Sequence, residues 1–276
     1  MMTNAEYHND LTADSNSMLK TFAKSPALYE ALNVTKTIEK QEPTPDMVVG
    51  SVTHTLWLQP EKFAAEYAVK PQCDRRTKGG KATYADFLLE SAGKQEIDAE
   101  SYALASAMVA ALNANEFAKA LRESAGAIVE MPIRWTDSAT GLALKAKPDL
   151  YAPAGGTDWA LCVDLKTTAD PGEAFARQVA NLAYYRQAAF YLDGCRACYD
   201  ADSPTKFLLV AVGKEPPHDV YVYHLGGDWI SQGVAENAAL LRRLAECKAS
   251  GVWRTPEQLT VSELPPPPKW LTNRGE

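Results

Sequence analysis

Residues 159–166 read WALCVDLK, and this stretch decides the fold. It is short, mostly apolar and preceded by a turn at 153–158, a pattern that predicts a buried β-strand. Because side chains alternate along a strand, Asp164 and Lys166 share one face with Cys162. Burying a carboxylate and an ammonium in an apolar strand costs free energy unless they pair or bind a metal. The stretch therefore predicts either a cross-strand ion pair or a metal site.

A second carboxylate is expected beside this strand. Residues 127–135 and 142–151 read as the two strands of a hairpin around a turn at 137–141. The second strand contains Lys-Pro-Asp, which places Asp149 next to the 159–166 strand. The two carboxylates of the chain's central segment can therefore converge.

Converging oxygen groups suit metal-assisted chemistry. The carboxylates of Asp149 and Asp164, with the main-chain carbonyl of Leu165, are hard ligands of the kind that Mg²⁺ or Mn²⁺ prefers. Such a metal lowers the pKa of a bound water and neutralises charge on a phosphodiester. Lys166 would orient the attacking water and stabilise the charge of the transition state.

Composition excludes several classes of protein. The chain has 276 residues, 28 Lys and Arg against 35 Asp and Glu, a formal charge of −7, and 46% hydrophobic residues. These proportions are typical of a globular protein and not of a disordered, collagenous or coiled-coil one. The sequence has no apolar run of membrane-spanning length and no secretory signal, so we expect a cytoplasmic protein without a membrane partner. Five scattered cysteines argue against a disulfide framework.

The order of elements predicts an α/β fold in a single domain over 1–276. Residues 1–125 read as mainly helical, 126–225 as the core, and 226–276 as a C-terminal helix with a proline-rich tail. Basic residues and a glycine pair predict a flexible loop at 72–81. The other expected elements are helices at 47–58, 97–122, 172–192 and 228–249, and strands at 206–212 and 220–224.

Two helices carry further candidate residues. Gln187 and Tyr191 lie four positions apart, so they share one face of the 172–192 helix, where they either serve the site or pack in the core. His54 follows the small residues Gly50 and Ser51, which leave room for a ligand or metal to approach it. A histidine on an apolar helix can equally be a core residue.

Together these motifs resemble a known family. Pro148-Asp149 and, after fourteen residues, Asp164-Leu165-Lys166 resemble the PD-(D/E)xK nuclease superfamily. Gln187 and Tyr191 are similar to the QxxxY motif of its RecB-like and lambda-exonuclease-like branch, and residues 50–54 (GSVTH) to the branch's small-residue-then-histidine motif. From about residue 7 to about residue 225 the chain resembles a RecE-like exonuclease of the exonuclease VIII type.

The resemblance implies a restriction-endonuclease-like core: a central mixed β-sheet flanked by helices, with a helical N-terminal elaboration. It implies an exodeoxyribonuclease that depends on Mg²⁺, with Mn²⁺ as a substitute, and degrades linear double-stranded DNA from 5′ to 3′. The 3′ single strands would pass to a RecT-like annealing protein in viral or prophage recombination. A ring-shaped homo-oligomer is also implied.

The resemblance also implies roles for single residues. The catalytic lysine would be Lys166, with Gln187 and Tyr191 positioning it or the scissile strand, and Glu130 either aimed at the same site or on the surface. The metal ligands would be Asp149, Asp164 and the Leu165 carbonyl, with His54 in the metal shell or at a phosphate. Contacts to DNA would come from Arg75, Arg76, Lys78 and Lys81, on the backbone phosphates or at a splitting duplex end, and from Tyr184 or Tyr185 stacked on frayed bases.

Two rival functions remain open. An endonuclease or repair nuclease of the same superfamily would cut circular DNA, which an exonuclease would not. A non-enzymatic DNA-binding module would use the fold without the chemistry. Against the module, Asp149, Asp164 and Lys166 are all present, and losing any one of them costs a nuclease most of its activity.

Overall fold

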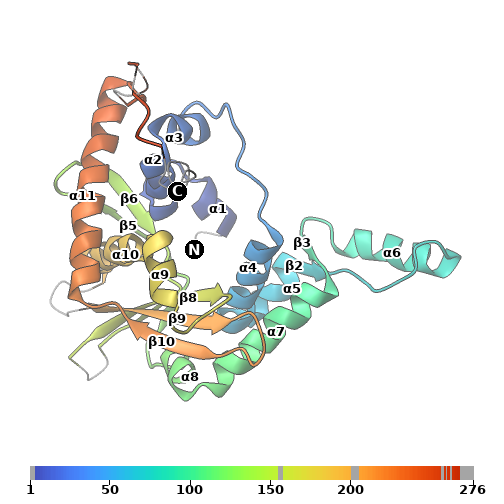
Figure 1. Ribbon diagram of the computed structural model, residues 1–276. Helices are drawn as coiled ribbons and strands as arrows, with labels where there is room; N and C mark the ends of the chain where they lie inside the picture. Colours follow the sequence, from blue (N-terminus) through green and yellow to red (C-terminus); the bar gives the residue numbers. More distant parts are fainter. Residues whose placement is uncertain are drawn as a thin grey trace, which may run out of the picture.

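The 159–166 stretch forms the central strand, β8, of a five-stranded mixed sheet (Figure 1). The strand order of this sheet is β10-β9-β8-β7-β4. β8 runs parallel to β9 and antiparallel to β7. The computed structural model describes residues 4–154, 158–199, 205–255, 258, 260–261 and 263–267. The strands of this sheet are β4 (Ile128–Val129), β7 (Leu150–Ala152), β8 (Ala160–Thr168), β9 (Thr205–Gly213) and β10 (Val220–His224). The strands expected at 159–166, 206–212 and 220–224 are thus confirmed.

The predicted hairpin is confirmed along its length, because both of its strand pairs are antiparallel in one register, but it is divided between two sheets. β5 (Ile133–Thr136) and β6 (Ala143–Ala146) pair antiparallel and form a second sheet with β1 (Asp14–Ser15). β4 and β7, which continue the same two segments, pair in the large sheet instead. The chain leaves one sheet for the other where Glu130 adopts a left-handed φ of 51°. Pro132 follows two residues after Glu130, and Pro148 directly precedes Asp149 on the other strand. Neither proline has the N–H that the hydrogen bonds between strands require.

The basic segment at 72–81 is not wholly a loop, which corrects the expectation. Helix α6 (Lys78–Glu90) begins inside it, and the Thr77 hydroxyl caps the helix by accepting the Gly80 N–H at 3.0 Å. A Cβ at Gly80 would lie 2.0 Å from the Asp74 carbonyl oxygen, so this turn requires glycine. Strands β2 (Tyr67–Val69) and β3 (Gln95–Ile97) pair in parallel on either side of α6 along the chain.

Two expected helices are interrupted. The 97–122 segment forms α7 (Ala99–Ala114) and α8 (Glu116–Arg122), because Asn115 adopts an extended conformation and its side chain caps α8 through the Ala118 N–H. The 172–192 segment forms α9 (Phe175–Asn181) and α10 (Tyr184–Cys198), divided by Ala183 in the left-handed conformation. The remaining helices are α1 (Asn4–Asn9), α2 (Asn16–Lys24), α3 (Pro26–Asn33), α4 (Pro45–Leu58), η1 (Pro60–Lys62), α5 (Phe63–Glu66) and α11 (Gly227–Ser250). Of the helices in the described ranges, each is too short or too polar to cross a lipid bilayer.

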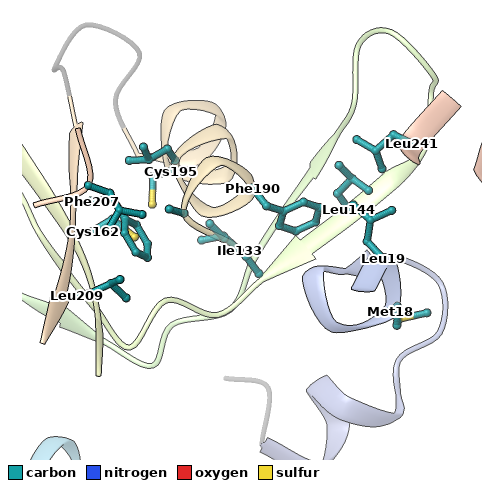
Figure 2. Close-up of a cluster of buried hydrophobic side chains, with 14 of the residues drawn as sticks. Met18, Leu19, Ile133, Leu144, Cys162, Phe190, Cys195, Phe207, Leu209 and Leu241 are labelled. Atoms are coloured by element: carbon teal, nitrogen blue, oxygen red, sulfur yellow. The ribbon is translucent and has the colours of Figure 1, made fainter. Parts of the chain in front are cut away.

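Helices cover both faces of the large sheet, and β8 separates two apolar clusters. On one face Cys162 belongs to a cluster with residues of α2, α10 and α11, and Figure 2 shows it near Cys195 of α10. On the other face Val163 and Leu165 pack against α4 and α7. The alternation expected for the 159–166 strand is therefore confirmed, and the charged pair lies on the α10 face.

The contact between α10 and α11 depends on a glycine. A Cβ at Gly233 would lie 2.4 Å from the Tyr185 carbonyl oxygen and 2.9 Å from the Ala189 Cβ. We expect Gly233→Ala to push the helices apart and lower the free energy of unfolding by about 1–3 kcal/mol, measured by urea denaturation. Gly227→Ala, on the same helix with no heavy atom within 4 Å, is the control and should change stability little. Equal effects of the two substitutions would contradict this account of the packing.

Candidate active site

The register of β7 and β8 brings the two predicted carboxylates to one place. Leu150 pairs with Val163, so Asp149, one residue before β7, lies across from Asp164. Asp149 Oδ2 accepts the main-chain N–H of Leu165 at 2.7 Å. Both carboxylates are buried, with 8% of Asp149 and 2% of Asp164 exposed. A pair of buried acids this close needs cations or proton sharing to balance it.

His54 of α4 contacts Asp149 and the main chain of β8 directly and is not a core histidine. Its Nε2 lies 2.9 Å from the Leu165 carbonyl oxygen, to which it donates, and its Nδ1 lies 3.3 Å from Asp149 Oδ2. α4 can pass close to β8 because it has glycine at position 50, where a Cβ would already lie 3.3 Å from Thr167 Oγ1. The small-residue-then-histidine pattern thus serves to bring the imidazole onto β8.

Glu130 completes a group of three possible metal ligands. Its main-chain N–H donates to the Asp149 carbonyl oxygen at 3.1 Å, and its carboxylate forms an ion pair with Lys147. The ligand atoms of Glu130, His54 and Asp149 all lie within 4.8 Å of one another. Glu130 therefore faces the site and is not a surface residue. Sequence analysis missed Lys147, although strand alternation from Asp149 could have suggested it.

Lys166 is held as a charged ammonium beside Asp164. Its Nζ lies 2.5 Å from Asp164 Oδ2 and 4.5 Å from the centre of the Tyr184 ring. Burial alone would lower the pKa of Lys166, but the charges of Asp164 and Asp149 outweigh it and raise the pKa above the usual value. A lysine in this state can donate hydrogen bonds and stabilise negative charge, but it cannot accept a proton.

The two residues of the QxxxY pattern support Asp164 from α10. Gln187 Nε2 donates to Asp164 Oδ1 at 2.7 Å, and the Tyr191 side chain is hydrogen-bonded to Gln187. Burial raises the pKa of the Tyr191 hydroxyl well above its usual value, so the hydroxyl stays protonated. Tyr185 points elsewhere, with its hydroxyl 2.9 Å from Glu236 Oε2 on α11.

The donor set fits a hard divalent cation. Asp149 and Glu130 offer carboxylates, Leu165 a carbonyl and His54 an imidazole. In addition, Asp164 Oδ2 is buried and receives no hydrogen bond of good geometry, despite the nearby ammonium. Carboxylate and carbonyl oxygens suit Mg²⁺ and Mn²⁺, and an imidazole is better tolerated by Mn²⁺.

Comparison with known proteins agrees with this geometry. Residues 15–258 match the family described as a PDDEXK-like domain of unknown function (DUF3799). The chain belongs to this family. It therefore lies within the PD-(D/E)xK nuclease superfamily and has its α/β restriction-endonuclease-like fold, as expected; the RecE-like type is a finer assignment. No curated protein matches the sequence.

Solved structures resemble this PDDEXK-like domain in fold. A protein from Eubacterium rectale, to which exonuclease activity is provisionally assigned, superimposes with a TM-score of 0.61 at 15% identity, over 95% of this chain and 99% of that one. The structure of SSO0001 superimposes with a TM-score of only 0.32 at 13% identity, over 72% of this chain and 88% of that one. The first likeness supports the fold, and the second is too weak to add to it.

A cleft of about 730 Å³ opens over the site of this PDDEXK-like domain. Its walls include His54, Glu130, Lys147, Lys166 and Tyr184. Tyr184 is thus one of the aromatic side chains in the cleft wall. None of the residues 70–94, all of which the structure describes, lines the cleft, so the four basic residues at 75–81 lie outside it.

The buried acid makes stability depend on pH. Burial raises the pKa of Asp149 to about 7 from 3.8, His54 opposes the rise, and Asp164 and Glu130 add to it. A raised pKa favours folding below pH 3.8, and this contribution is lost as the pH rises through 7. In chelator at pH 8, we therefore expect Asp149→Asn to unfold at higher temperature than the wild type, with a gain of up to about 4 kcal/mol.

Thermal unfolding of both proteins between pH 5 and pH 8 checks this expectation. The gap in favour of Asp149→Asn should widen with pH, because only the wild type must ionise the buried acid. Asp193→Asn, on the outer part of α10, is the control and should show no such trend. A gap that does not change with pH would show that Asp149 is already ionised in the folded protein at low pH.

Proposed function

We propose that this PDDEXK-like domain is a divalent-metal-dependent exodeoxyribonuclease that degrades linear double-stranded DNA from 5′ to 3′. The observation that carries the proposal is the Asp164–Lys166 ion pair beside the His54, Glu130 and Asp149 cluster, with His54, Glu130 and Lys166 lining one cleft. Acidic metal ligands next to a charged lysine are the parts that phosphodiester hydrolysis needs. The provisional assignment of the Eubacterium rectale protein supports the exonuclease class.

The chain's residues divide the work of hydrolysis. Lys166 would place its ammonium against the phosphate and stabilise the negative charge that develops there. Asp164 holds Lys166, and Gln187 in turn holds Asp164 at 2.7 Å. A divalent cation held by Asp149, Asp164, Glu130, His54 and the Leu165 carbonyl would lower the pKa of a bound water and neutralise phosphate charge. Tyr184 would stack on the neighbouring base and fix the strand.

The biological setting that we propose follows the RecE-like resemblance. The 3′ single strands would be handed to a RecT-like annealing protein in viral or prophage recombination in the cytoplasm. The protein would act as a ring-shaped homo-oligomer, which keeps the DNA threaded between cleavage steps. Light scattering of the purified protein tests the oligomer, and co-purification tests the annealing partner.

The proposed activity is tested on matched linear and closed circular duplexes with Mg²⁺, Mn²⁺ or EDTA. Linear-only degradation that EDTA abolishes is the expected result. Phosphorothioate linkages, placed at the 5′ ends of one duplex and at the 3′ ends of another, give the polarity. Blocking the 5′ ends should stop degradation, and blocking the 3′ ends should not. Cutting of the circle would indicate an endonuclease. Duplex binding without metal-dependent cleavage of either substrate would indicate a non-enzymatic module.

A further inference from the structure

Residues 70–94 form an arm that leaves the body of the protein and returns to it. β2 and β3 anchor its two ends, with Tyr67 paired to Gln95 and Val69 to Ile97. Between them, α6 lies apart from the sheets and the other helices in Figure 1, and Phe87 is its one buried residue. Because α6 runs back toward β3, its first residue, Lys78, lies at the far end. Its 13 residues give it a length of about 20 Å.

The arm is basic in an acidic protein. Residues 70–94 hold six basic and three acidic residues, a net charge of +3, while the whole chain carries −7. The positive charge gathers at the far end, where Arg75, Arg76, Lys78 and Lys81 follow Asp74 with no further acid before Asp86. A local basic end on an acidic body attracts a polyanion to that end and repels it elsewhere.

The far end of the arm has a fixed structure of its own. Asp74 Oδ1 accepts both the main-chain N–H and Nε of Arg76 at 3.0 Å. The Arg75 guanidinium lies 4.5 Å from the centre of the Tyr84 ring. Lys78 and Lys81 are exposed, three positions apart on one face of the helix. These contacts order the arginines and leave the two ammonium groups facing solvent.

The near end of the arm borders the cleft. Tyr67 and Gln95, which anchor the arm, also line the cleft above the site. DNA lying in the cleft therefore passes the base of the arm. The charged end stands about 20 Å further out, which spans about six base pairs at 3.4 Å each.

We propose that the arm grips the phosphate backbone of intact duplex about six base pairs from the bond that is cut. This proposal rests on the proposed nuclease function for the position of the cut. Of the two roles expected for these residues, the proposal keeps contact with the backbone phosphates and not the splitting of a duplex end, because the charged end of the arm lies outside the cleft. The grip is electrostatic and independent of sequence, since phosphate contacts carry no base information.

The test compares Lys78→Gln/Lys81→Gln with the wild type. Both lysines are exposed, so the variant should keep the thermal stability of the wild type. Binding to a labelled 30-base-pair duplex is measured by fluorescence anisotropy in EDTA over a range of salt concentrations. Losing two phosphate contacts should reduce the magnitude of the slope of log K against log salt by about 2. Lys119→Gln/Arg242→Gln, which removes two exposed charges from α8 and α11, is the control and should leave the slope unchanged.

A second substrate shows where the contact lies. A hairpin with a four-base-pair stem is too short to reach the end of the arm, so the variant and the wild type should bind it equally. Equal salt slopes for wild type and variant on the long duplex would overturn the proposal, and so would an equal loss on the short stem or no duplex binding by the wild type.

These measurements separate the arm from the catalytic site because EDTA prevents cleavage. If the protein binds DNA through the arm but never cleaves it, the proposed arm contact is supported and the proposed nuclease function is contradicted. Normal cleavage with arm-independent binding would do the reverse.

Discussion

Lys166→Ala should lower kcat/KM on linear duplex DNA by about 10³-fold, the size of effect seen when a preorganised charge is removed from a transition state. The ammonium sits 2.5 Å from Asp164 Oδ2 and 4.5 Å from the centre of the Tyr184 ring, and alanine places no charge there. The raised pKa of Lys166 keeps it charged across the neutral range, so the loss should not depend on pH between 6 and 9. Single-turnover cleavage with saturating Mn²⁺ gives the measurement.

Lys206→Ala is the matched control for this prediction. Lys206 lies on the neighbouring strand β9, with its Nζ 3.8 Å from the centre of the Trp159 ring, and it does not line the cleft. Its removal should leave cleavage within a few fold of the wild type. Lys166→Met keeps the apolar stem and guards against a folding defect. Activity of the Met variant within tenfold of the wild type, at unchanged thermal stability, would remove Lys166 from the mechanism.

Asp164→Asn should be about as damaging, for two separable reasons. The change leaves Lys166 without its closest counter-charge, and removing one partner of a buried pair costs about 3 kcal/mol of stability. It also removes a carboxylate that faces Asp149 across the strands, so Mn²⁺ affinity should fall as well. We expect cleavage to drop by about 10³-fold and Mn²⁺ binding, measured by calorimetry, to weaken by at least about tenfold.

The control for Asp164→Asn is Asp193→Asn on α10. Asp193 accepts a hydrogen bond from Trp135 Nε1 at 2.9 Å and neither belongs to the metal-donor group nor lines the cleft, so its substitution should spare both cleavage and Mn²⁺ binding. If Asp164→Asn keeps wild-type Mn²⁺ affinity but loses cleavage, Asp164 serves Lys166 alone and the metal is held without it. Retained cleavage would contradict the site as a whole.

Local patterns were enough to predict the central strand and the residues on it. The alternation of WALCVDLK gave the shared face of Asp164 and Lys166, and the four-residue spacing of Gln187 and Tyr191 gave their common side of α10. Such signals depend only on the period of a strand or a helix, which the sequence displays directly. The roles of these residues in catalysis and metal binding stay predictions.

The interruptions were not predictable in the same way, because tertiary packing imposes them. Ala183 has no residue-type preference for the left-handed conformation it adopts between α9 and α10. Likewise, nothing near Glu130 in the sequence shows that its strand changes sheets there. The start of α6 is different: Thr77, three residues before Gly80, is an ordinary N-cap signal that the glycine pair obscured.

The position of β8 between the two apolar clusters limits how this protein can be altered. Residues of β8 belong to both clusters, and the same main chain sets the spacing between Asp164 and Lys166. Heat inactivation should therefore coincide with cooperative unfolding, with no inactive but folded state before it. Substitutions meant to raise thermal stability are therefore best placed on the outer helices. Substitutions meant to change DNA binding are best placed on the arm, whose replacement leaves the two clusters intact.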